Sequence, residues 1–365
     1  MRVLGLSAYP IEAAATRFRL AQYVRPLAES GIQLEVSPFL TGSQFSNLYT
    51  PGQGASRLNG LGSSIVKRIA QVGTIRDYDL LFVQREAMLV GPAIFEGLYR
   101  FIGKMPMVLD LDDATYVRYI SPSYGRLGSY LKFFGKTDKL IKASRVVTCG
   151  NSYIAEYVQS LGKETVVIPT VVDTDEFKPS PKSNEVPVVG WIGTHSTFPF
   201  LEWLFPVLEE LAVKHRFQLK IVGAGRTHIT LKGVEVISSP WELGREVEEF
   251  QSLDIGLYPM TLSDSANEKW LLGKSGFKAI QYMAVGVPFV MSPIGVAADL
   301  GEPGKTHFNA SSERDWYTQL EKLLSDSELR LRMGEAGRQH SLENYTVEQQ
   351  AKLLASTFRE AVAKK

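Results

Sequence analysis

The sequence has one cysteine, few histidines and no long hydrophobic run. Because Cys149 has no second cysteine to pair with, an intrachain disulfide is excluded and a reducing, cytoplasmic environment is favoured. The five histidines are scattered rather than paired on one helical turn, so we expect no protein-bound zinc. No segment approaches about 18 apolar residues, and the apolar start at 1–6 is too short for a signal peptide. We therefore expect neither a membrane-spanning helix nor export.

What is present is the composition of a folded, two-domain protein. The 365 residues are 44% hydrophobic and 22% charged, and the length is about twice that of a usual single domain. The net charge of +1 is unevenly distributed: residues 1–173 hold 19 Lys and Arg against 14 Asp and Glu, whereas the rest hold 21 against 25. A basic first half suits an acidic partner, a lipid headgroup or a phosphate. The alternative is a chance asymmetry of a few charges.

Short apolar runs alternate with helical patterns in both halves of the chain. This order predicts two parallel sheets with crossover helices, an α/β architecture of two doubly wound, Rossmann-like domains separated by a Pro/Ser segment at 178–183. Ligands of such sheets bind outside the carboxyl ends of the strands, so we expect the domains to face each other across a substrate cleft. The predicted strands are Val3–Leu6, Gln33–Val36, Leu80–Val83, Met107–Leu109, Val146–Thr148, Val166–Ile168, Val188–Ile192, Leu219–Val222, Val234–Ile237, Ile255–Tyr258 and Phe289–Ser292.

The densest pattern in the second half is the run Gly273-Lys-Ser-Gly-Phe-Lys-Ala-Ile-Gln-Tyr-Met-Ala-Val-Gly-Val-Pro288. It predicts a helix that begins at Lys274-Ser-Gly276, ends at a glycine and leads through a proline into a buried strand. Free backbone N–H groups at the start of a helix attract phosphate, and Lys274, Lys278 and Gln281 are spaced to extend along one side of it. The alternative is a packed helix with two solvated lysines.

The end of this run, Gln281-Tyr-Met-Ala-Val-Gly-Val-Pro288, resembles the donor segment of the retaining glycosyltransferases of family 4, which have the two-domain GT-B fold. The segment 166–177 resembles the family's connection between its domains, and Gly190-Trp-Ile-Gly-Thr-His-Ser-Thr197 resembles the first strand and turn of its donor domain. The tail segments 329–338 and 345–346 are also similar, so the resemblance extends over nearly the whole chain.

The resemblance implies that 1–173 is an acceptor-side domain, that 174–345 binds a nucleotide-sugar donor, and that a C-terminal helix at about 346–365 packs back on the first domain. In the family, the start of a helix and basic residues hold the diphosphate, and two carboxylates eight residues apart hold the sugar and the ribose. Carried onto this sequence, the donor-binding residues are Gly193, Thr194, His195, Lys274, Ser275, Gly276, Lys278 and Gln281.

The sequence departs from the family pattern at the donor site. Gln281 and Gly273 stand where the two carboxylates are usual. Gln281 can still exchange hydrogen bonds with ribose hydroxyls, and either Glu268 or Asp264 is left as the carboxylate for the hexose. A subset of the family has a Gly-Lys-x-Gly-Phe-Lys-x-x-Gln-Tyr-Met-Ala segment like this one, so we interpret the change as a subfamily feature. His195 stands where many relatives have basic residues, so the first lysine of the run should carry more of the contact to the diphosphate.

In the acceptor half, Asp110-Leu-Asp-Asp113 directly follows a predicted strand and so places carboxylates at a strand's carboxyl end. Strand alternation aims Asp110 and Asp112 one way and Leu111 and Asp113 the other. Ionised acids this close repel one another, so we expect cation or hydroxyl partners. By resemblance the cluster lies near the acceptor, whose hydroxyl Asp112 or Asp113 would orient. A helix N-cap cluster and a metal-binding Asp-x-Asp are the alternatives.

Arginines also stand near predicted strand ends. Arg17 and Arg19 lie in the first helix, and Arg85 follows a strand. Their guanidinium groups match phosphate oxygens and would neutralise a donor or acceptor phosphate. Surface ion pairs are the alternative.

Between 126 and 145, six basic residues and several aromatic ones accompany a single acid, Asp138. A basic helix with aromatic residues suits an anionic membrane, so a peripheral contact at the inner face of the membrane is one hypothesis, and a packed helix with a solvated basic face is the other. No nucleic-acid-binding module accompanies the pattern, so we expect no nucleic-acid partner.

These inferences together predict a cytoplasmic retaining hexosyltransferase that acts on a nucleotide-sugar donor and a glycan or lipid-linked acceptor in surface polysaccharide biosynthesis. By resemblance no metal and no other cofactor is required: Lys274, Gly193 and the helix start hold the leaving diphosphate, whose oxygen helps to deprotonate the acceptor. Asp112, Asp113 and Lys274 are the catalytic candidates. Two alternatives stay open, a nucleotide-sugar 2-epimerase of the same fold and a non-catalytic sugar-nucleotide-binding protein.

Overall fold

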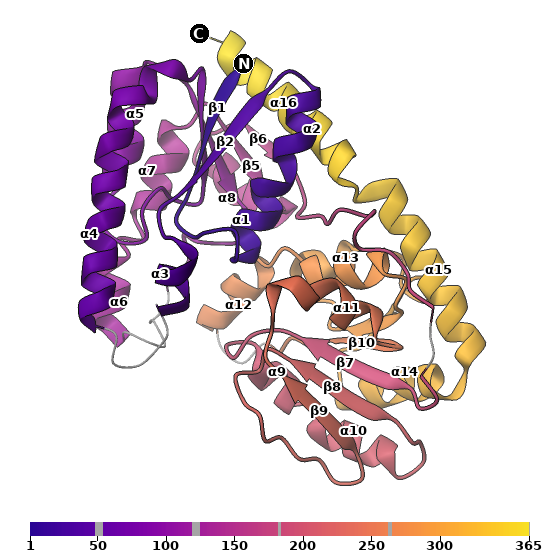
Figure 1. Cartoon of the computed structure of the whole chain (residues 1–365). Coiled ribbons are helices and arrows are strands. Elements are labelled where there is room, and N and C mark those ends of the chain that lie inside the picture. The colour runs from indigo at the N-terminus through magenta and orange to yellow at the C-terminus, as the bar shows by residue number, and fades with distance from the viewer. Residues whose placement is uncertain (48–53, 119–124, 182–183, 262–264, 365) are drawn as a thin grey trace. The chain divides into compact units, whose positions relative to one another are not determined.

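The computed structural model describes residues 1–47, 54–118, 125–181, 184–261 and 265–364 (Figure 1). The chain forms two compact units, and each is assembled from more than one segment. The first unit consists of Met1–Thr170, Ser265–Ser275 and Val347–Lys365, and the second of Val171–Asp264 and Gly276–Thr346.

The first unit is built on one six-stranded sheet. All neighbouring strands run parallel, in the order β2-β1-β3-β4-β5-β6. Each strand begins and ends within two residues of its predicted range, because aliphatic and β-branched residues bounded by turn residues mark it clearly. The strands are β1 (Arg2–Ser7), β2 (Gln33–Pro38), β3 (Leu80–Gln84), β4 (Met107–Leu111), β5 (Val146–Cys149) and β6 (Thr165–Val167).

Helices cover both faces of this sheet. Leu81 and Leu109 belong to a core shared with α5, α7 and α8. Phe82 lies on the opposite face, where its ring packs edge-on against Phe358 of α16 with centroids 4.9 Å apart. Figure 1 shows α16 running alongside α2 on that side. The helices are α1 (Ala14–Arg19), α2 (Val24–Glu29), α3 (Gly42–Asn47), α4 (Gly54–Gln71), α5 (Ile94–Gly103), α6 (Gly125–Leu131), α7 (Lys136–Ala143), α8 (Ser152–Ser160), α12 (Ser265–Leu272) and α16 (Val347–Ala363), with 3-10 turns η1 (Ala21–Tyr23) and η2 (Val72–Asp77).

The second unit has its own six-stranded parallel sheet, in the order β12-β11-β10-β7-β8-β9. Five of its strands were predicted. The sixth, β12, was missed because two residues form no recognisable apolar run. The strands are β7 (Val188–Ile192), β8 (Gln218–Val222), β9 (Glu235–Ser239), β10 (Ile255–Tyr258), β11 (Phe289–Met291) and β12 (Phe308–Asn309).

The order of strands in the second sheet reverses beside β7. The chain passes from β7 to β8 and β9 on one side and then to β10, β11 and β12 on the other. The carboxyl ends of β7 and β10 therefore flank a topological switch point, where doubly wound sheets bind ligands. The helices of this unit are α9 (Phe198–Glu202), α10 (Phe205–Ala212), α11 (Glu246–Gln251), α13 (Phe277–Ala284), α14 (Glu313–Ser325) and α15 (Ser327–Asn344), with 3-10 turns η3 (Leu243–Arg245) and η4 (Gly295–Asp299).

The predicted helix start at Lys274 was wrong. Helix α13 begins at Phe277, because Gly276 before it has a left-handed φ of 65° that a helix interior excludes. Lys274 and Ser275 instead lie in the segment that follows α12, and they belong to the first unit. The other end of α13 agrees with the prediction, since Gly286 follows it with a φ of 67°.

We expected the basic segment 126–145 to form one helix, but it forms two. Helix α6 ends at Leu131 and α7 begins at Lys136, and Phe133 between them has a left-handed φ of 53°. Lys136 is buried, so its charge does not contribute to an exposed basic face. None of the helices in the described ranges is long and apolar enough to cross a membrane.

Candidate active site

The carboxyl ends of β3 and β4 carry an ion pair between one arginine and two aspartates. The strands are neighbours, and their register pairs Gln84 with Asp110, which brings Arg85 beside Asp112. Arg85 donates from Nε and Nη2 to the two carboxylate oxygens of Asp112, both at 2.6 Å, and from Nη2 to Asp113 Oδ2 at 3.0 Å. Gln84 Nε2 donates to Asp112 Oδ1 at 2.9 Å. The aspartate cluster thus has the cation partner that its charge requires.

Arg85 adopts an uncommon backbone conformation to reach the aspartates. Its φ is 59°, in the left-handed region, which costs a non-glycine residue about 1 kcal/mol. Its backbone N–H donates to the carbonyl of Asp110 at 2.8 Å, so the turn is tied to the neighbouring strand. Residues held in this region gather at functional sites, because the surrounding structure must maintain the strain.

Arg85 and Asp112 stabilise each other's charged form. Burial alone would raise the pKa of Asp112, but the charge and hydrogen bonds of Arg85 outweigh burial and lower that pKa below its ordinary value. Burial would likewise lower the pKa of Arg85, yet Asp112 and Asp113 raise it above the ordinary value. Asp112 is therefore ionised and bound on both oxygens. It positions Arg85 and is not suited to take up a proton.

Lys274 joins this cluster from the segment after α12. Its Nζ lies 3.7 Å from Asp113 Oδ2 and 3.7 Å from the ring centroid of Trp270. Asn151 holds the segment in place, since its Nδ2 donates to the carbonyls of Gly273 and Lys274 at 3.3 and 3.1 Å. Burial, with a further contribution from Arg85, lowers the pKa of Lys274 despite the attraction of Asp113.

Asp113 and Lys274 are the most accessible members of the cluster. About a quarter of each side chain is exposed, 24% and 25%, whereas Asp112 is buried. A partly exposed carboxylate and a partly exposed ammonium group therefore stand side by side at this edge of the first sheet. The sequence suggested both residues, but not that they meet.

Asp110 does not share the partners of Asp112, although strand alternation was predicted to aim the two the same way. The strand β4 ends at Leu111, so its alternation does not extend to Asp112. It lies on the opposite face from Leu111 and forms a buried ion pair with Arg19, whose Nε donates to Asp110 Oδ2 at 2.9 Å. Thr148 donates to the other carboxylate oxygen at 2.6 Å, and Arg19 also donates to the carbonyl of Ile168.

This pairing corrects the expectation that Arg19 meets a phosphate. Its guanidinium is buried and bound to protein acceptors, so Arg19 and Asp110 fix helix α1 to the sheet instead. Arg17 is half-buried and donates to the carbonyls of Ile11 and Glu12 at 3.2 and 3.4 Å.

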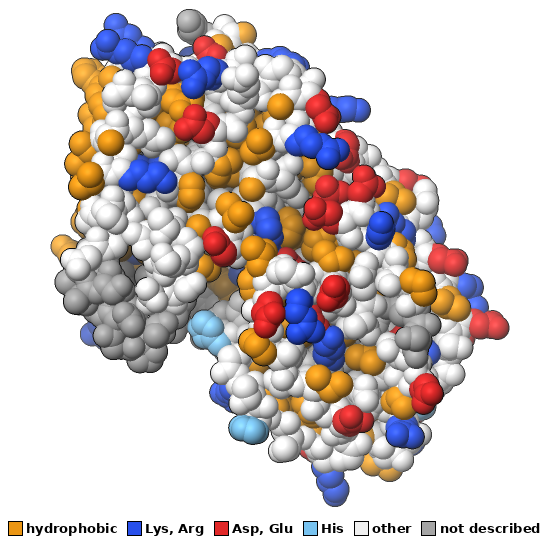
Figure 2. Space-filling view, in the orientation of Figure 1, with side chains coloured by type: hydrophobic (Ala, Val, Ile, Leu, Met, Phe, Trp, Pro, Cys, Tyr) orange, Lys and Arg blue, Asp and Glu red, His pale blue; other side chains and the backbone are white. Residues whose placement is uncertain are grey.

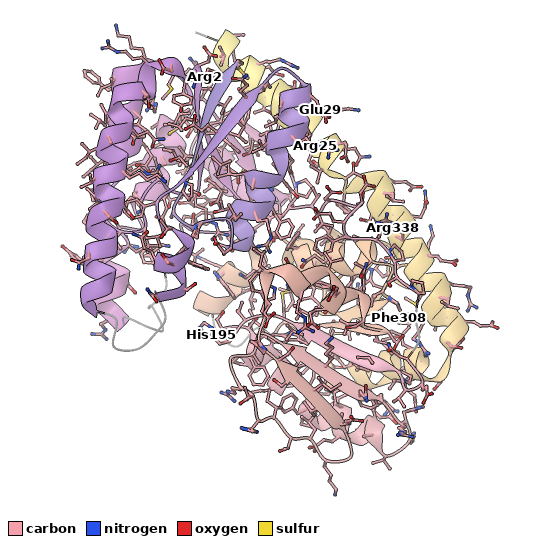
Figure 3. The ribbon with its side chains drawn as sticks, viewed as in Figure 1. Arg2, Arg25, Glu29, His195, Phe308 and Arg338 are labelled. Carbon is pink, nitrogen blue, oxygen red and sulfur yellow. The ribbon has the colours of Figure 1, made fainter. Side chains whose placement is uncertain are left out.

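In the second unit, the loop after β7 holds Gly193, Thr194 and His195 at the switch point. Thr194 and His195 are exposed, and Figure 3 shows His195 beyond the strand's end. A Cβ on Gly193 would meet the ring of Trp191, and a Cβ on Gly223, after β8, would meet the carbonyl of Gly193. The two turns therefore approach as closely as glycine permits.

The sequence analysis missed the second of these turns. Gly223 and Gly225 have φ of 84° and 74° and form a Gly-x-Gly turn directly after a strand. The Gly-x-Gly spacing directly after a predicted strand is the sequence signal that could have identified this turn.

Gln281 is buried, and both ends of its amide are bound within the second unit. Its Nε2 donates to Glu246 Oε1 at 3.1 Å, and its Oε1 accepts from Lys278 Nζ at 3.2 Å. A ribose hydroxyl would have to compete with these partners. Glu246, at the start of α11, was missed because no local pattern links it to a residue 35 positions away.

Glu268 and Asp264 are the two carboxylates that the sequence left as candidates for the hexose. Glu268 is exposed on α12, and Asp264 lies outside the described residues. Ser275 is half-buried and Gly276 buried. Among the residues that the structure describes, no three His, Cys, Asp or Glu side chains come together in a group that could hold a metal ion.

Comparisons with known proteins agree with this arrangement. Residues 186–326 match the family described as Glycosyl transferases group 1. Sucrose-phosphate synthase from Thermosynechococcus elongatus is 13% identical over 100% of both chains, with a TM-score of 0.67. HepE from Anabaena, solved with UDP-glucose, is 16% identical over 99% of this chain and 100% of its own, with a TM-score of 0.69. A glycosyltransferase from Rickettsia africae is 11% identical over 100% of this chain and 99% of its own, also at 0.69. No curated protein sequence matches the chain.

At identities of 11–16%, the likeness to solved structures establishes the fold. Two parallel six-stranded sheets with flanking helices match the GT-B glycosyltransferases. The matched segment, 186–326, begins just before β7 and ends after α14, so it contains the whole second sheet. The group 1 domain and the GT-B fold together indicate a glycosyltransferase.

Proposed function

We propose that this glycosyltransferase is a retaining enzyme of family 4 that transfers a hexosyl unit from a nucleotide-diphosphate sugar to a glycan or lipid-linked acceptor. Its place is the cytoplasmic stage of surface polysaccharide synthesis, and the reaction requires no metal. The observation that carries the proposal is the position of Asp113 between Arg85 and Lys274 at the edge of the first sheet. The group 1 domain of the second unit supports a nucleotide-sugar donor, as do the structures of HepE in complex with UDP and with UDP-glucose.

In this proposal the two units have different substrates. The second unit binds the donor through the turns at Gly193–His195 and Gly223–Gly225 and through the start of α13, where Gly276 and Lys278 lie. The first unit binds the acceptor, with the acceptor hydroxyl donating to Asp113.

The reaction exchanges one glycosidic bond for another. The bond from the anomeric carbon to the diphosphate oxygen breaks, and the acceptor oxygen bonds to the same face of that carbon. The acceptor proton passes to the departing diphosphate oxygen, so the products are a nucleoside diphosphate and a glycoside. Lys274 opposes the charge that develops on the diphosphate, and such electrostatic stabilisation is usually the largest contribution to the rate.

The test is a panel of nucleotide sugars, first by thermal shift and then by release of nucleoside diphosphate with EDTA present. We expect one donor to raise the melting temperature and to be hydrolysed slowly without acceptor. Lys274→Ala should reduce both effects, whereas Lys269→Ala, an exposed lysine on α12, should not. Stabilisation without diphosphate release would identify a binding protein. A sugar epimerised at C2 would identify a 2-epimerase, and either result would overturn the proposal.

A further inference from the structure

The first unit contains an open pocket to which the proposed function assigns no role. It has a volume of about 650 Å³ and lies where the start of α5 meets α6 and α7. Its apolar lining comes from Pro92, Ala93, Tyr130, Phe133 and Phe134. A pocket of this size with a predominantly apolar lining is in the range of small-molecule sites.

The turn between α6 and α7 holds two aromatic rings at the rim of this pocket. Tyr130 is 75% exposed and Phe133 43% exposed, with ring centroids 6.1 Å apart. Phe133 has a left-handed backbone conformation. A hydrogen bond from the N–H of Lys136 to the carbonyl of Phe133, at 2.8 Å, stabilises this turn. A bulky residue in this conformation is strained. The exposed part of the Phe133 side chain gains no burial within the unit that would offset this strain. An apolar ligand would supply that burial.

The pocket carries uncompensated positive charge. Lys136, which also lines it, is neutralised by Glu86 at 2.7 Å and donates to two backbone carbonyls. Arg118 and Lys139 also line the pocket, and neither has a carboxylate partner in the described part of the chain. The sequence has no Asp or Glu between Asp113 and Asp138. An apolar pocket with free cations on its wall suits an apolar ligand that carries an anionic group.

A narrow space of about 10 Å³ lies beside this pocket. Phe134 and Lys136 line both, and the narrow space is also lined by Arg85 and Thr115. Thr115 Oγ1 is buried and has no hydrogen-bond partner among the described residues. Buried hydroxyls are normally paired, and the narrow space beside this one has room for about one water molecule. The pocket thus shares two residues with a space lined by Arg85, which contacts Asp113.

Exposed apolar side chains extend from the pocket along two neighbouring helices. Val66 and Ile69 of α4 and Ile94 and Phe101 of α5 are each more than half exposed. Helices α4 and α5 are joined by a hydrogen bond from Tyr99 to a carbonyl of α4. Figure 2 shows hydrophobic side chains gathered at the edge of the molecule over these helices. Patches of this kind on a soluble protein mark an interaction surface, and lipid is one that suits the pocket beside it.

We propose that this pocket binds the lipid-phosphate portion of a membrane-borne acceptor, with the hydrocarbon chain against Tyr130 and Phe133 and the phosphate on Arg118 and Lys139. The inference rests on the proposed function, because it takes Asp113 as the acceptor site. It selects the lipid-linked acceptor from the two classes that the proposed function allows. The glycan end of the acceptor would leave through the open side of the pocket, which belongs to the same unit as Asp113.

The test is binding of dodecyl phosphate to the full chain, by calorimetry below the micelle concentration of the probe and without donor. Dodecyl maltoside and inorganic phosphate are the two comparison probes. Dodecyl phosphate should bind at least about tenfold more tightly than either, because it alone offers both a chain and an anion. Phe133→Ser and Lys139→Glu should each weaken its binding by about tenfold.

Two matched variants control for non-specific adsorption. Val213→Ser removes an apolar side chain of the second unit that is 85% exposed and does not line the pocket, and Lys142→Glu reverses an exposed charge on α7 that does not line it. Both should bind dodecyl phosphate within about twofold of the wild type. Tyr130→Ser, at an even more exposed position, replaces Phe133→Ser if thermal unfolding shows that the latter misfolds.

Three binding results would overturn the proposal. Equal binding of dodecyl maltoside would remove the role of the phosphate, and equal binding of inorganic phosphate would remove the role of the chain. Equal weakening by Val213→Ser would mean adsorption to any apolar surface. Because the probe binds without donor, absent binding together with intact diphosphate release would overturn the lipid pocket alone. Binding without diphosphate release would overturn the proposed function alone.

Discussion

Arg85 and Asp112 form a two-point ion pair at the edge of the first sheet, with both nitrogen–oxygen distances at 2.6 Å. The pair leaves Asp113 with one contact to Arg85 and one to Lys274, and so keeps its carboxylate partly exposed. The division of roles follows from this geometry. Both oxygens of Asp112 are occupied by Arg85, whereas Asp113 stays accessible to a substrate.

The first prediction concerns the stability that this pair contributes. Arg85→Ala leaves the buried Asp112 without its cation, and we expect a loss of about 3 kcal/mol in the free energy of unfolding at pH 7, measured with urea. Arg25→Ala is the control, because Arg25 and Glu29 form an exposed pair that should contribute less than about 0.5 kcal/mol (Figure 3).

The contribution of Arg85 should also depend on pH in a defined direction. The pKa of Asp112 is lowered in the folded chain, so the unfolded chain binds its proton first as the pH falls. The stabilisation is complete above the unfolded value of about 4 and is lost as the pH falls through the lower, folded value. The difference between wild type and Arg85→Ala should therefore shrink below about pH 4. A difference that stays constant down to pH 2 would contradict the assignment.

The second prediction concerns the charge state of Lys274. Its pKa is lowered, mainly by burial, so it loses its proton at a lower pH than an ordinary lysine. If the charged form binds the diphosphate, donor turnover should fall on the alkaline side with an apparent pKa below 10.5. Lys274→Arg retains its charge, so its alkaline limb should move to higher pH. An unchanged limb would show that another group titrates.

Lys274→Ala tests the same residue by removing the charge altogether. Losing a charge-assisted contact costs about 1.5–3 kcal/mol, which corresponds to a roughly 10- to 100-fold loss of donor turnover. Turnover within about twofold of the wild type would contradict a role at the diphosphate.

The third prediction follows from the contact of Gln281 with Glu246. Gln281→Glu restores the carboxylate usual in the resembled family, but here it removes a donor and faces Glu246 at about 3 Å. We expect the variant to be about 2 kcal/mol less stable than the wild type at pH 7, and to recover near pH 4, where one of the two acids can hold a proton.

Exchanging the two residues provides the control. The double variant Glu246→Gln with Gln281→Glu keeps one amide and one carboxylate in contact, and it should recover most of the stability lost in either single variant. Simple additivity of the two losses would show that the pair does not interact. Lys278, which donates to Gln281 at 3.2 Å, is retained in all of these variants.

The sequence predicted what depends on local pattern and missed what depends on distant contacts. The strands were found because apolar runs mark them, and the alternation of Asp110 and Leu111 followed from strand geometry. The meeting of Lys274 with Asp113 was missed, because it depends on Asn151 binding a segment more than 120 residues away. The start of α13 was misplaced because a glycine before a helix gives no signal of its φ.

The last prediction concerns the packing of α13 against α15. A Cβ on Gly334 of α15 would meet the backbone carbonyl oxygen of Gly286, just after α13. A backbone atom cannot move aside as a side chain can, and Arg338 further ties the helices, donating from α15 to the carbonyls of Ala284 and Phe177 at 2.8 and 2.7 Å (Figure 3). Gly334→Ala should therefore lower the free energy of unfolding by about 1–3 kcal/mol.

Gly97→Ala is the matched control for this substitution. Gly97 is an exposed glycine inside α5, and a Cβ there would meet no atom within 4 Å. Alanine favours a helix over glycine, so this variant should gain up to about 1 kcal/mol. Urea unfolding of both variants measures the difference, and its sign is decisive, because helix propensity acts in the same direction at both positions. If Gly334→Ala were as stable as Gly97→Ala, the close approach of the two helices at Gly286 would be wrong.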